Sequence, residues 1–259
     1  MTFSEPVVVV GVGQMGGVFA RGFLNAGHPV YPVTSDMTMA DAARQVPEPQ
    51  FVLVAVPENV LAETLARVPG PWRGQLGLLQ NELLPCVWEK AGIQNPTAMA
   101  VWFEKKKGTD VHVFQATAVY GPNAAIVQAG LKAVDIPCDV MTDEKALLVA
   151  LIQKTLYVLT INIAGLVSGG TTGGLWANHR ELAVNVASDI MDLLDTVTPY
   201  ACDREKMLAF LGDILEKVPN HQCRGRVAAD RLARVMAHAR KNDLQLSTLK
   251  WIAQREIRE

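Results

Sequence analysis

The chain has 259 residues, which is room for one large domain or two modest ones. Hydrophobic residues make up 49% and charged residues 19%, so a large core can form and wholesale disorder is excluded. With 24 basic and 26 acidic residues the net charge is -2, and the sequence offers no electrostatic footprint for nucleic acid or an anionic membrane.

Up to Thr142, short apolar runs alternate with helical stretches. The predicted strands are Pro6–Val10, Val30–Val33, Phe51–Val56, Leu76–Gln80, Ala98–Phe103, Val111–Ala118 and Val134–Met141. The predicted helices are Gln14–Ala26, Thr38–Gln45, Asn59–Arg67 and Ala124–Ala133. Several strands are continuously apolar, as expected for strands covered on both faces. This alternation predicts an α/β fold, with a doubly wound, mostly parallel Rossmann sheet in a dinucleotide-binding domain of residues 1–142.

After Thr142 the pattern is helical throughout. Asp143–Val167 is predicted as one long helix, which ends at the glycine-rich segment Ser168–Gly174. Further helices are predicted at Ala177–Asp195, Asp203–Lys217, Arg224–Arg240 and Ser247–Arg258. We therefore expect residues 143–259 to form an all-helical domain for substrate binding and dimerisation. Its apolar content is high for a domain that packs alone, which favours a homodimer.

The apolar segment Ala146–Leu166 has the length of a membrane span. It contains Gln153, Lys154 and Asn162, whose polar side chains would be costly in lipid, so we predict a buried helix of a soluble domain. The first strand begins near Pro6, which leaves no room for a signal peptide. We expect a cytoplasmic protein with no membrane partner.

The cysteines give no sign of a metal site. They are not arranged in close-spaced pairs, so zinc-binding and thioredoxin-like motifs are missing from the sequence. Reduced thiols in a cytosolic protein are the favoured interpretation, and a disulfide is the alternative. The four residues are Cys86, Cys138, Cys202 and Cys223.

The first predicted strand runs directly into the sequence GVGQMG at residues 11–16, a G-x-G-x-x-G motif that opens a helix. Here Gly11 permits a tight turn, Gly13 lets a pyrophosphate approach the backbone, and Gly16 lets the helix pack on the strand. The helix amino terminus adds N–H groups and a partial positive charge. The motif, with Gln14 and Met15, predicts a dinucleotide site; the alternative is a turn that only joins strand to helix.

The end of the second strand selects the dinucleotide, because an acidic side chain there would bind the ribose 2′-hydroxyl of NAD. Counted from Gly27, the strand ends at Thr34 or Ser35, whereas a count from the last glycine of the motif leads to Asp36. We prefer the first count, which follows one strand only. Hydroxyl groups leave room for a 2′-phosphate, so NADP is expected and NAD is the alternative. Arg44 is a distant candidate for that phosphate.

Four stretches resemble the ketopantoate reductase family, within the larger group of 6-phosphogluconate and 3-hydroxyacid dehydrogenases. The first is GVGQMGG followed by AGHPV, and the second is Leu79–Glu82, which is similar to the family's Gln-Asn-Gly. The third is His112–Pro122, which ends in Gly-Pro like a late sheet strand of the family. The fourth is Lys154–Asn162, which is similar to the family's inter-domain helix. The resemblance extends to about residue 185.

In that family a carbonyl acid is reduced by NADPH, a helix lysine donates the proton, and asparagines hold cofactor and substrate. The resemblance assigns the lysine to Lys154, the second helix asparagine to Asn162, and the asparagine after the fourth strand to Asn81. The lysine that often follows the third strand in the family is absent, and Pro57-Glu58 stand there. Val56 and Pro57 are expected to line the cofactor.

Other positions depart from the family pattern. Val158 replaces the first helix asparagine, and Ser188, beside Asp189, replaces a glutamate on the next helix. A serine and a glutamate of the family have no clear match around Asn220–Asp230. The resemblance therefore implies the fold and cofactor more strongly than the substrate, and a diverged pocket.

Carbonyl reduction needs a hydride, which a nicotinamide provides, and a proton, which the protein provides. A lysine on an apolar helix suits this role because burial lowers the pKa of an amine. Asn162 lies two turns beyond Lys154, about 12 Å along the axis, and a helix at the domain junction would present both groups to a cleft. The alternative is that Lys154 reaches solvent and Asn162 satisfies backbone groups in the core.

The sequence thus predicts an NAD(P)H-dependent oxidoreductase that reduces a small oxo-acid to a hydroxy-acid. The alternative, favoured by Val158 and Ser188, is a non-catalytic dinucleotide-binding sensor or partner-binding protein.

Overall fold

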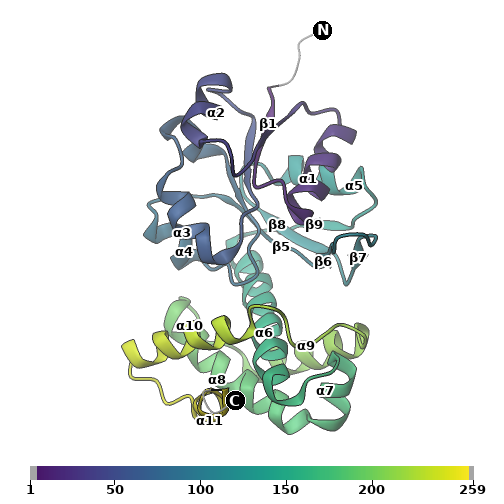
Figure 1. The fold of residues 1–259 in the computed structure, drawn as a ribbon, viewed down its shortest axis with the longest axis vertical. Helices are drawn as coiled ribbons and strands as arrows, with labels where there is room; N and C mark the ends of the chain where they lie inside the picture. Colours follow the sequence, from purple (N-terminus) through teal and green to yellow (C-terminus); the bar gives the residue numbers. More distant parts are fainter. Residues whose placement is uncertain (1–4, 257–259) are drawn as a thin grey trace. The chain divides into compact units, whose positions relative to one another are not determined.

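The computed structural model describes residues 5–256 (Figure 1). The chain forms two compact units, Met1–Leu151 and Ile152–Glu259, and the division between them falls inside one helix, α6 (Glu144–Ser168). The boundary predicted after Thr142 lies just before this helix, whereas the two units divide after Leu151. At the start of the helix the Asp143 carboxylate accepts a hydrogen bond from the backbone N–H of Ala146 at 2.8 Å. The predicted end of the last helix, at Arg258, lies outside the described residues.

A seven-stranded sheet forms the centre of the first unit. Across the sheet the strands are β2 (Val30–Val33), β1 (Val7–Val10), β3 (Phe51–Val54), β4 (Leu76–Leu78), β5 (Thr97–Ala100), β8 (Thr117–Tyr120) and β9 (Cys138–Val140). The pairs from β2 to β5 are parallel, β8 is antiparallel to β5, and β9 is parallel to β8. The predicted mostly parallel sheet is confirmed.

Helices cover both faces of this sheet. The helices α1 (Gln14–Asn25) and α5 (Ala124–Lys132) lie on one side, and α2 (Met39–Gln45), α3 (Glu58–Ala66) and α4 (Pro85–Lys90) lie on the other (Figure 1). Helix α2 begins where the Thr38 hydroxyl accepts a hydrogen bond from the N–H of Asp41 at 3.1 Å. Helix α4 and the 3-10 helix η1 (Gly70–Gln75) were not predicted, since each is only six residues long.

Two predicted strands are divided in the structure. The predicted strand Ala98–Phe103 is split between β5 and β6 (Phe103–Glu104), and Val111–Ala118 is split between β7 (His112–Val113) and β8. The chain leaves the sheet near Trp102, whose carbonyl accepts a hydrogen bond from the N–H of Phe114 at 2.8 Å. Strands β6 and β7 then pair as a separate antiparallel hairpin with an exposed lysine-rich turn.

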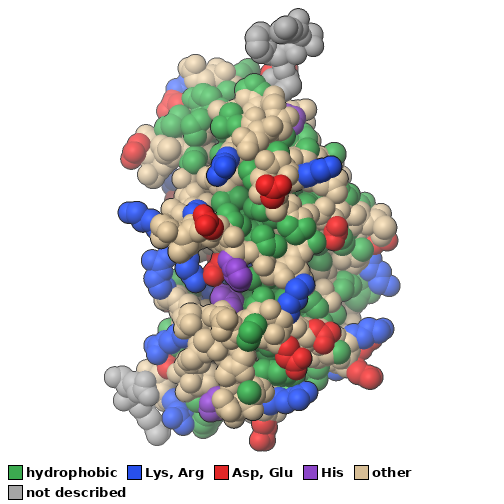
Figure 2. Space-filling model, turned by 90° about the vertical axis from the view of Figure 1, so that its right-hand side faces the viewer, with side chains coloured by type: hydrophobic (Ala, Val, Ile, Leu, Met, Phe, Trp, Pro, Cys, Tyr) green, Lys and Arg blue, Asp and Glu red, His purple; other side chains and the backbone are tan. Residues whose placement is uncertain are grey.

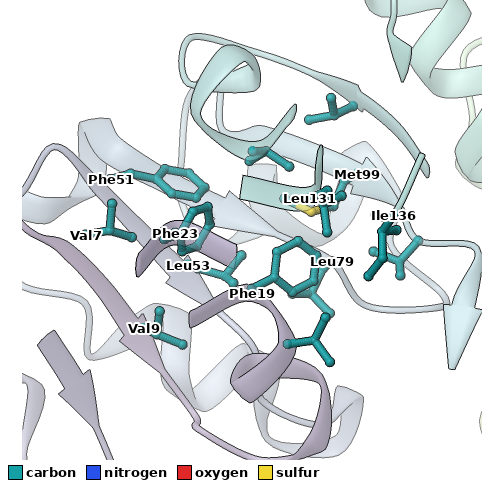
Figure 3. Packing of buried hydrophobic residues seen from close by; sticks show 14 of the residues in the cluster. Val7, Val9, Phe19, Phe23, Phe51, Leu53, Leu79, Met99, Leu131 and Ile136 are labelled. Carbon is teal, nitrogen blue, oxygen red and sulfur yellow. The ribbon is translucent and has the colours of Figure 1, made fainter. Parts of the chain in front are cut away.

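The core of the first unit lies between the sheet and helices α1 and α5. Strands β1 and β3 are buried along their whole length, and Phe19 and Phe23 of α1 pack against them (Figure 3). Helices α1 and α5 approach closely at two glycines: a Cβ added to Gly22 would lie 2.4 Å from the carbonyl oxygen of Gly130. This close contact anchors the helix that carries the glycine-rich turn.

The second unit is built from the larger part of α6 together with α7 (Thr172–Asn178), α8 (Arg180–Val197), α9 (Arg204–Lys217), α10 (Ala228–Lys241) and α11 (Ser247–Glu256). Its described residues form only helices and one isolated bridge, between Thr171 and Gln222, so the predicted all-helical character is confirmed. Helix α7 was not predicted, because its first residues belong to the glycine-rich segment. Only residues 169–171 of that segment lie between α6 and α7, with Gly169 and Gly170 at positive φ, and the Thr171 side chain caps α7.

Helix α6 is long and apolar enough to cross a membrane by length and composition alone. In the structure, 83% of its most apolar 18-residue window is buried. This is the environment of a helix inside a folded domain, as predicted from its polar residues.

On the face shown in Figure 2, acidic and basic side chains are interspersed, and neither sign covers a large area.

Candidate functional site

The glycine-rich turn connects β1 to α1, and two of its glycines are required by the protein itself. Gly11 has φ +90°, and a Cβ there would lie 2.8 Å from the carbonyl oxygen of Ala55. A Cβ at Gly16 would lie 2.0 Å from the carbonyl oxygen of Gly11 and 3.2 Å from the Ala55 Cβ. The turn and the packing of α1 against β1 and β3 therefore depend on these two glycines.

Gly13 differs from Gly11 and Gly16 because, apart from the residues adjoining it in the chain, no described atom lies within 4 Å of where its Cβ would be. It is the N-cap residue of α1, and among the described residues no side chain caps this helix and no acidic residue occupies its first turn. The exposed backbone N–H groups and partial positive charge at this helix end are suited to phosphate. Gln14 is exposed and Met15 half-buried in the same first turn.

The order of the strands places this turn where open α/β sheets bind ligands. Strand β2 pairs with one side of β1 and β3 with the other, so the chain reverses direction across the sheet at this point. Ligands bind outside the carboxyl ends of strands at such a switch point. Val56 and Pro57 follow β3 at this edge, close to the turn: the Cγ1 of Val56 would be 3.2 Å from a Cβ on Gly11.

Gln80 connects the loops that follow β3 and β4. Its buried side-chain amide donates hydrogen bonds to the carbonyl oxygens of Val54 (2.8 Å) and Val56 (3.1 Å). Asn81, the next residue, is half-buried. In the sequence, Gln80 stands out only as part of a motif, whereas in the structure it fixes the loop in which Val56 and Pro57 lie.

The end of β2 carries the residues expected to meet the ribose. The strand ends at Val33, so Thr34 is the first residue beyond it, followed by Ser35 and Asp36, and all three are exposed. The carbonyl of Thr34 accepts a hydrogen bond from the N–H of Met37 at 3.1 Å, which makes the segment a turn. Arg44, the distant phosphate candidate, forms an ion pair with Asp41 on α2.

In the second unit, Lys154 and Asn162 are both buried on α6, with 5% and 6% of their surfaces exposed. The Lys154 ammonium lies 5.9 Å from the ring centroid of Tyr157, and the Tyr157 hydroxyl lies 2.6 Å from Nδ1 of His221. Tyr157 and His221 were not singled out from the sequence, because 64 residues separate them.

Asn162 is held by three hydrogen bonds. Its Oδ1 accepts from the N–H of Gly225 and from Nη1 of Arg231, both at 3.1 Å, and its Nδ2 donates to the carbonyl of Val158 at 2.9 Å. Arg231 is itself buried, with 6% of its surface exposed. Arg231 was not predicted as a site residue, although it is a basic residue on the otherwise apolar stripe of α10 formed by Ala228, Leu232, Val235 and Ala239.

Ser188, which departs from the family pattern, and the adjacent Asp189 both form hydrogen bonds with backbone groups of the second unit. The Ser188 hydroxyl donates to the carbonyl of Val184 within α8, at 2.9 Å. The buried carboxylate of Asp189 accepts hydrogen bonds from the N–H groups of Thr248 (2.8 Å) and Leu249 (2.9 Å) in the first turn of α11. Burial raises the pKa of Asp189, against the opposing effect of these two hydrogen bonds.

All four cysteines are free thiols. Burial raises the pKa of Cys86, and it raises the pKa of Cys138 and Cys202 to about 12 and that of Cys223 to about 11. Within residues 5–256, no group of three His, Cys, Asp or Glu side chains is placed to hold a metal ion.

The chain folds as a Rossmann-type α/β unit, with the glycine-rich turn after its first strand, followed by a helical unit. No model of a known protein family matches the chain, and no curated protein matches it. Solved structures do: the chain is similar to 2-dehydropantoate 2-reductase from Methylococcus capsulatus, with a TM-score of 0.70, 13% identity and coverage of 97% of this chain and 95% of that one.

Two further solved structures are similar to this chain over nearly their whole length. Dimeric ketopantoate reductase from Staphylococcus aureus matches with a TM-score of 0.67, 14% identity and coverage of 98% and 100% of the two chains. D-mandelate dehydrogenase with NADH matches with a TM-score of 0.68, 11% identity and coverage of 96% of each chain. The chain therefore has the fold of the ketopantoate reductases, with a strongly diverged sequence.

Proposed function

We propose that this protein is an NAD(P)H-dependent oxidoreductase that reduces a small oxo-acid to a hydroxy-acid. The observation that carries the proposal is the open position at Gly13, at the uncapped amino terminus of α1 and at the switch point of the sheet. A pyrophosphate held there by backbone N–H groups fits this geometry. Gly11, Gln14, Met15 and Gly16 complete the turn, and Thr34, Ser35, Val56, Pro57 and Asn81 are the further residues that we assign to the cofactor.

The chemistry assigned to the helical unit is proton donation by Lys154. When bound, the reduced nicotinamide supplies a hydride to the substrate's carbonyl carbon. The Lys154 ammonium gives a proton to the carbonyl oxygen, so an N–H bond breaks, an O–H bond forms, and the neutral amine takes up a proton from solvent. Lys154 lies buried among apolar residues of α6, with 5% of its surface exposed. Asn81 and Asn162 are the further residues that we assign to catalysis.

A non-catalytic dinucleotide-binding sensor or partner-binding protein is the second candidate. It is favoured by Val158, which presents a buried apolar side chain on the same helix, and by Ser188, whose hydroxyl bonds within α8. This candidate predicts that a dinucleotide binds and that no oxo-acid is reduced.

The experiment that separates the two candidates is a turnover screen of small 2-oxo acids with NADPH and NADH, preceded by calorimetric titration of each dinucleotide. Oxidation of the dinucleotide, followed by its absorbance, with release of the hydroxy-acid is the result expected of a reductase. Binding without turnover of any acid would support the sensor. If neither dinucleotide binds, both candidates fail.

We further propose that NADP is the preferred cofactor. Thr34 and Ser35 directly follow β2, and their hydroxyls neither repel a 2′-phosphate nor compete with it for space as a carboxylate would. The titration should therefore give a lower Kd for NADPH than for NADH. A Kd for NADH equal to or below that for NADPH would overturn this preference and assign the ribose contact to Asp36.

We also propose a cytoplasmic homodimer that uses the helices of the second unit. Trp251 of α11 is 44% exposed, and with Leu182 it lines an open groove of about 410 Å³ between the start of α8 and the start of α11. A large exposed aromatic side chain in such a groove is typical of a protein–protein contact. A second copy of the chain is the occupant that we favour, since the similar ketopantoate reductase of Staphylococcus aureus is described as dimeric.

A further inference from the structure

We propose that the homodimer is built around a reciprocal ion pair, in which Arg255 of the partner subunit enters the groove between α8 and α11 and pairs with the Glu181 carboxylate. The same contact forms a second time with the two chains exchanged. The inference rests on the homodimer of the proposed function, and it names the charged residues that hold the copies together. Both are exposed, Glu181 in the first turn of α8 and Arg255 in the last turn of α11.

The first step concerns the chemistry of the groove. Its lining offers a carboxylate, an amide, two hydroxyls and an aromatic ring, and among the described residues no basic side chain belongs to it. The lining residues are Glu181, Leu182 and Asn185 of α8 and Ser247, Thr248 and Trp251 of α11. A carboxylate attracts a guanidinium through charge-assisted hydrogen bonds, and a tryptophan ring attracts it through its π-face. The groove is therefore suited to a cationic side chain.

Asp189 adds a second carboxylate beside this groove. It follows Asn185 by one turn of α8, so the two side chains lie on the same face of the helix. Its Oδ2 accepts hydrogen bonds from the N–H groups of Thr248 and Leu249, whereas Oδ1 accepts none from the residues that the structure describes. The carboxylate thus fixes the start of α11 with one oxygen and adds negative charge to the groove.

The second step concerns the two charges of the proposed pair. Within residues 5–256, neither Glu181 nor Arg255 forms an ion pair in its own chain. The Arg255 guanidinium instead lies over the ring of Trp251, 5.0 Å from the ring centroid. A stacked guanidinium keeps its planar fork of N–H donors available for a carboxylate. The surface thus carries an anion and a cation that complement each other in a second copy.

The third step concerns symmetry. Trp251 lies between the two charges, because its ring lines the groove together with Glu181 and also carries the Arg255 guanidinium. In a two-fold dimer, a contact of one residue with another is repeated with the two chains exchanged. A two-fold axis near Trp251 exchanges the position of Arg255 with that of the groove. Both pairs then form together, and Trp251, which is 44% exposed, is covered between them.

The test is charge reversal in the full-length chain, with the Kd of the dimer measured by sedimentation equilibrium. Glu181→Arg and Arg255→Glu each place two pairs of like charges across the interface, so each should raise the Kd by about 30-fold or more. The matched controls are Glu205→Arg on α9 and Arg240→Glu on α10, which reverse exposed charges elsewhere in the second unit. Their Kd should stay within about twofold of wild type.

A mixture of the two single variants tests whether the pair forms between chains. In the mixed dimer, each substituted residue meets the opposite charge on the other chain. We expect the mixture to form dimers at a concentration where each variant alone sediments as a single chain. The double variant Glu181→Arg/Arg255→Glu should likewise regain the homodimer. A substitution that only disturbed α8 or α11 within its own chain would not be rescued by a second chain.

Three results would overturn the inference: a Kd that neither reversal changes, no association in the mixture, or a double variant that dimerises no more tightly than the single variants. If circular dichroism shows that a reversal fails to fold, Glu181→Gln and Arg255→Gln take its place. Each should raise the Kd, and their effects should not add if the two residues form one pair; additive effects would overturn the pair.

Failure of the proposed function gives different results. A wild-type protein that sediments as a single chain at every concentration would overturn the homodimer, and the ion pair with it. If neither dinucleotide binds, the reductase proposal fails, but the charge reversals still test the contact between the two copies, because all the residues involved lie in the second unit.

Discussion

Gly13 and Gly16 are separated by one helical turn, but the structure makes different demands on them. The site of a Cβ at Gly13 is open, whereas at Gly16 it would overlap the carbonyl of Gly11. Gly13→Val should therefore abolish binding of NADPH and NADH by calorimetry and leave the melting temperature within a few degrees of wild type. Gly16→Val is the matched variant and should lower the melting temperature strongly. Full dinucleotide affinity in Gly13→Val would remove the pyrophosphate from this turn.

Lys154 is the residue on which the catalytic proposal depends. Lys154→Ala should reduce turnover by about 10²–10⁴-fold, the usual effect of losing a general acid, while the Kd for NADPH stays nearly unchanged. Lys154→Met should do the same, since it preserves bulk but removes the donor. Lys217→Met, at an exposed position on α9, is the control. Turnover by Lys154→Met at the wild-type rate would show that another group donates the proton.

At this scale the sequence predicted the residues that belong to a local pattern. Gly11, Gly13 and Gly16 could be recognised because their spacing is fixed by one turn and one helix. The partners of Asn162 could not, because Arg231 is 69 residues further along the chain and reaches Asn162 only through the packing of α10 on α6. Spacing along a chain carries no information about such a contact.

At the scale of elements, continuity of apolar character decided which strands were predicted well. The buried runs of β1 and β3 were located to within one or two residues, because covered strands have few polar interruptions. The hairpin of β6 and β7 was not separated from its neighbours, since its strands are two residues long and the pattern of a two-residue strand is too short to read. Helix α7 was not predicted, because two glycines lie in its first turn and glycine is a poor helix former.

Asp189 joins two helices, because its side chain on α8 caps the amino terminus of α11. Asp189→Ala should lower the free energy of unfolding by about 1–2 kcal/mol, the usual cost of removing an N-cap. Asp189→Asn keeps an oxygen that can accept both hydrogen bonds, and its loss should be smaller. Chemical denaturation of the three proteins at neutral pH measures both values. Equal stability of wild type and Asp189→Ala would mean that α11 does not depend on this cap.

A comparison of wild type with Asp189→Asn should also reveal the titration of Asp189. Its pKa is raised by burial, so the folded protein binds a proton more readily than the unfolded chain. Wild type should therefore lose stability relative to Asp189→Asn as the pH rises from the unfolded pKa, about 3.9, through the raised folded value. A difference that stays constant with pH across the acidic range would contradict this assignment.

At the scale of the whole molecule, the proposed homodimer can be tested directly by measuring the mass of the assembly. Light scattering at micromolar concentration should give the mass of two chains. Trp251→Glu places a charge in the open groove and should shift the protein toward monomers, whereas Leu24→Glu, at an exposed position of α1 in the first unit, should not. A wild-type mass of one chain would exclude the dimer.

The raised pKa values of the cysteines have a practical consequence for labelling. Maleimides react with thiolates, and a thiol whose pKa is near 11 or 12 is almost entirely protonated at pH 7. A cysteine introduced at an exposed site would keep a pKa of about 8.5 and react much faster than these native thiols. Lys107 in the first unit and Lys217 in the second are suitable sites. A donor and an acceptor dye can be attached at these two sites while the native cysteines are kept. A change in the efficiency of energy transfer between the dyes when nucleotide is added would show that the two units move.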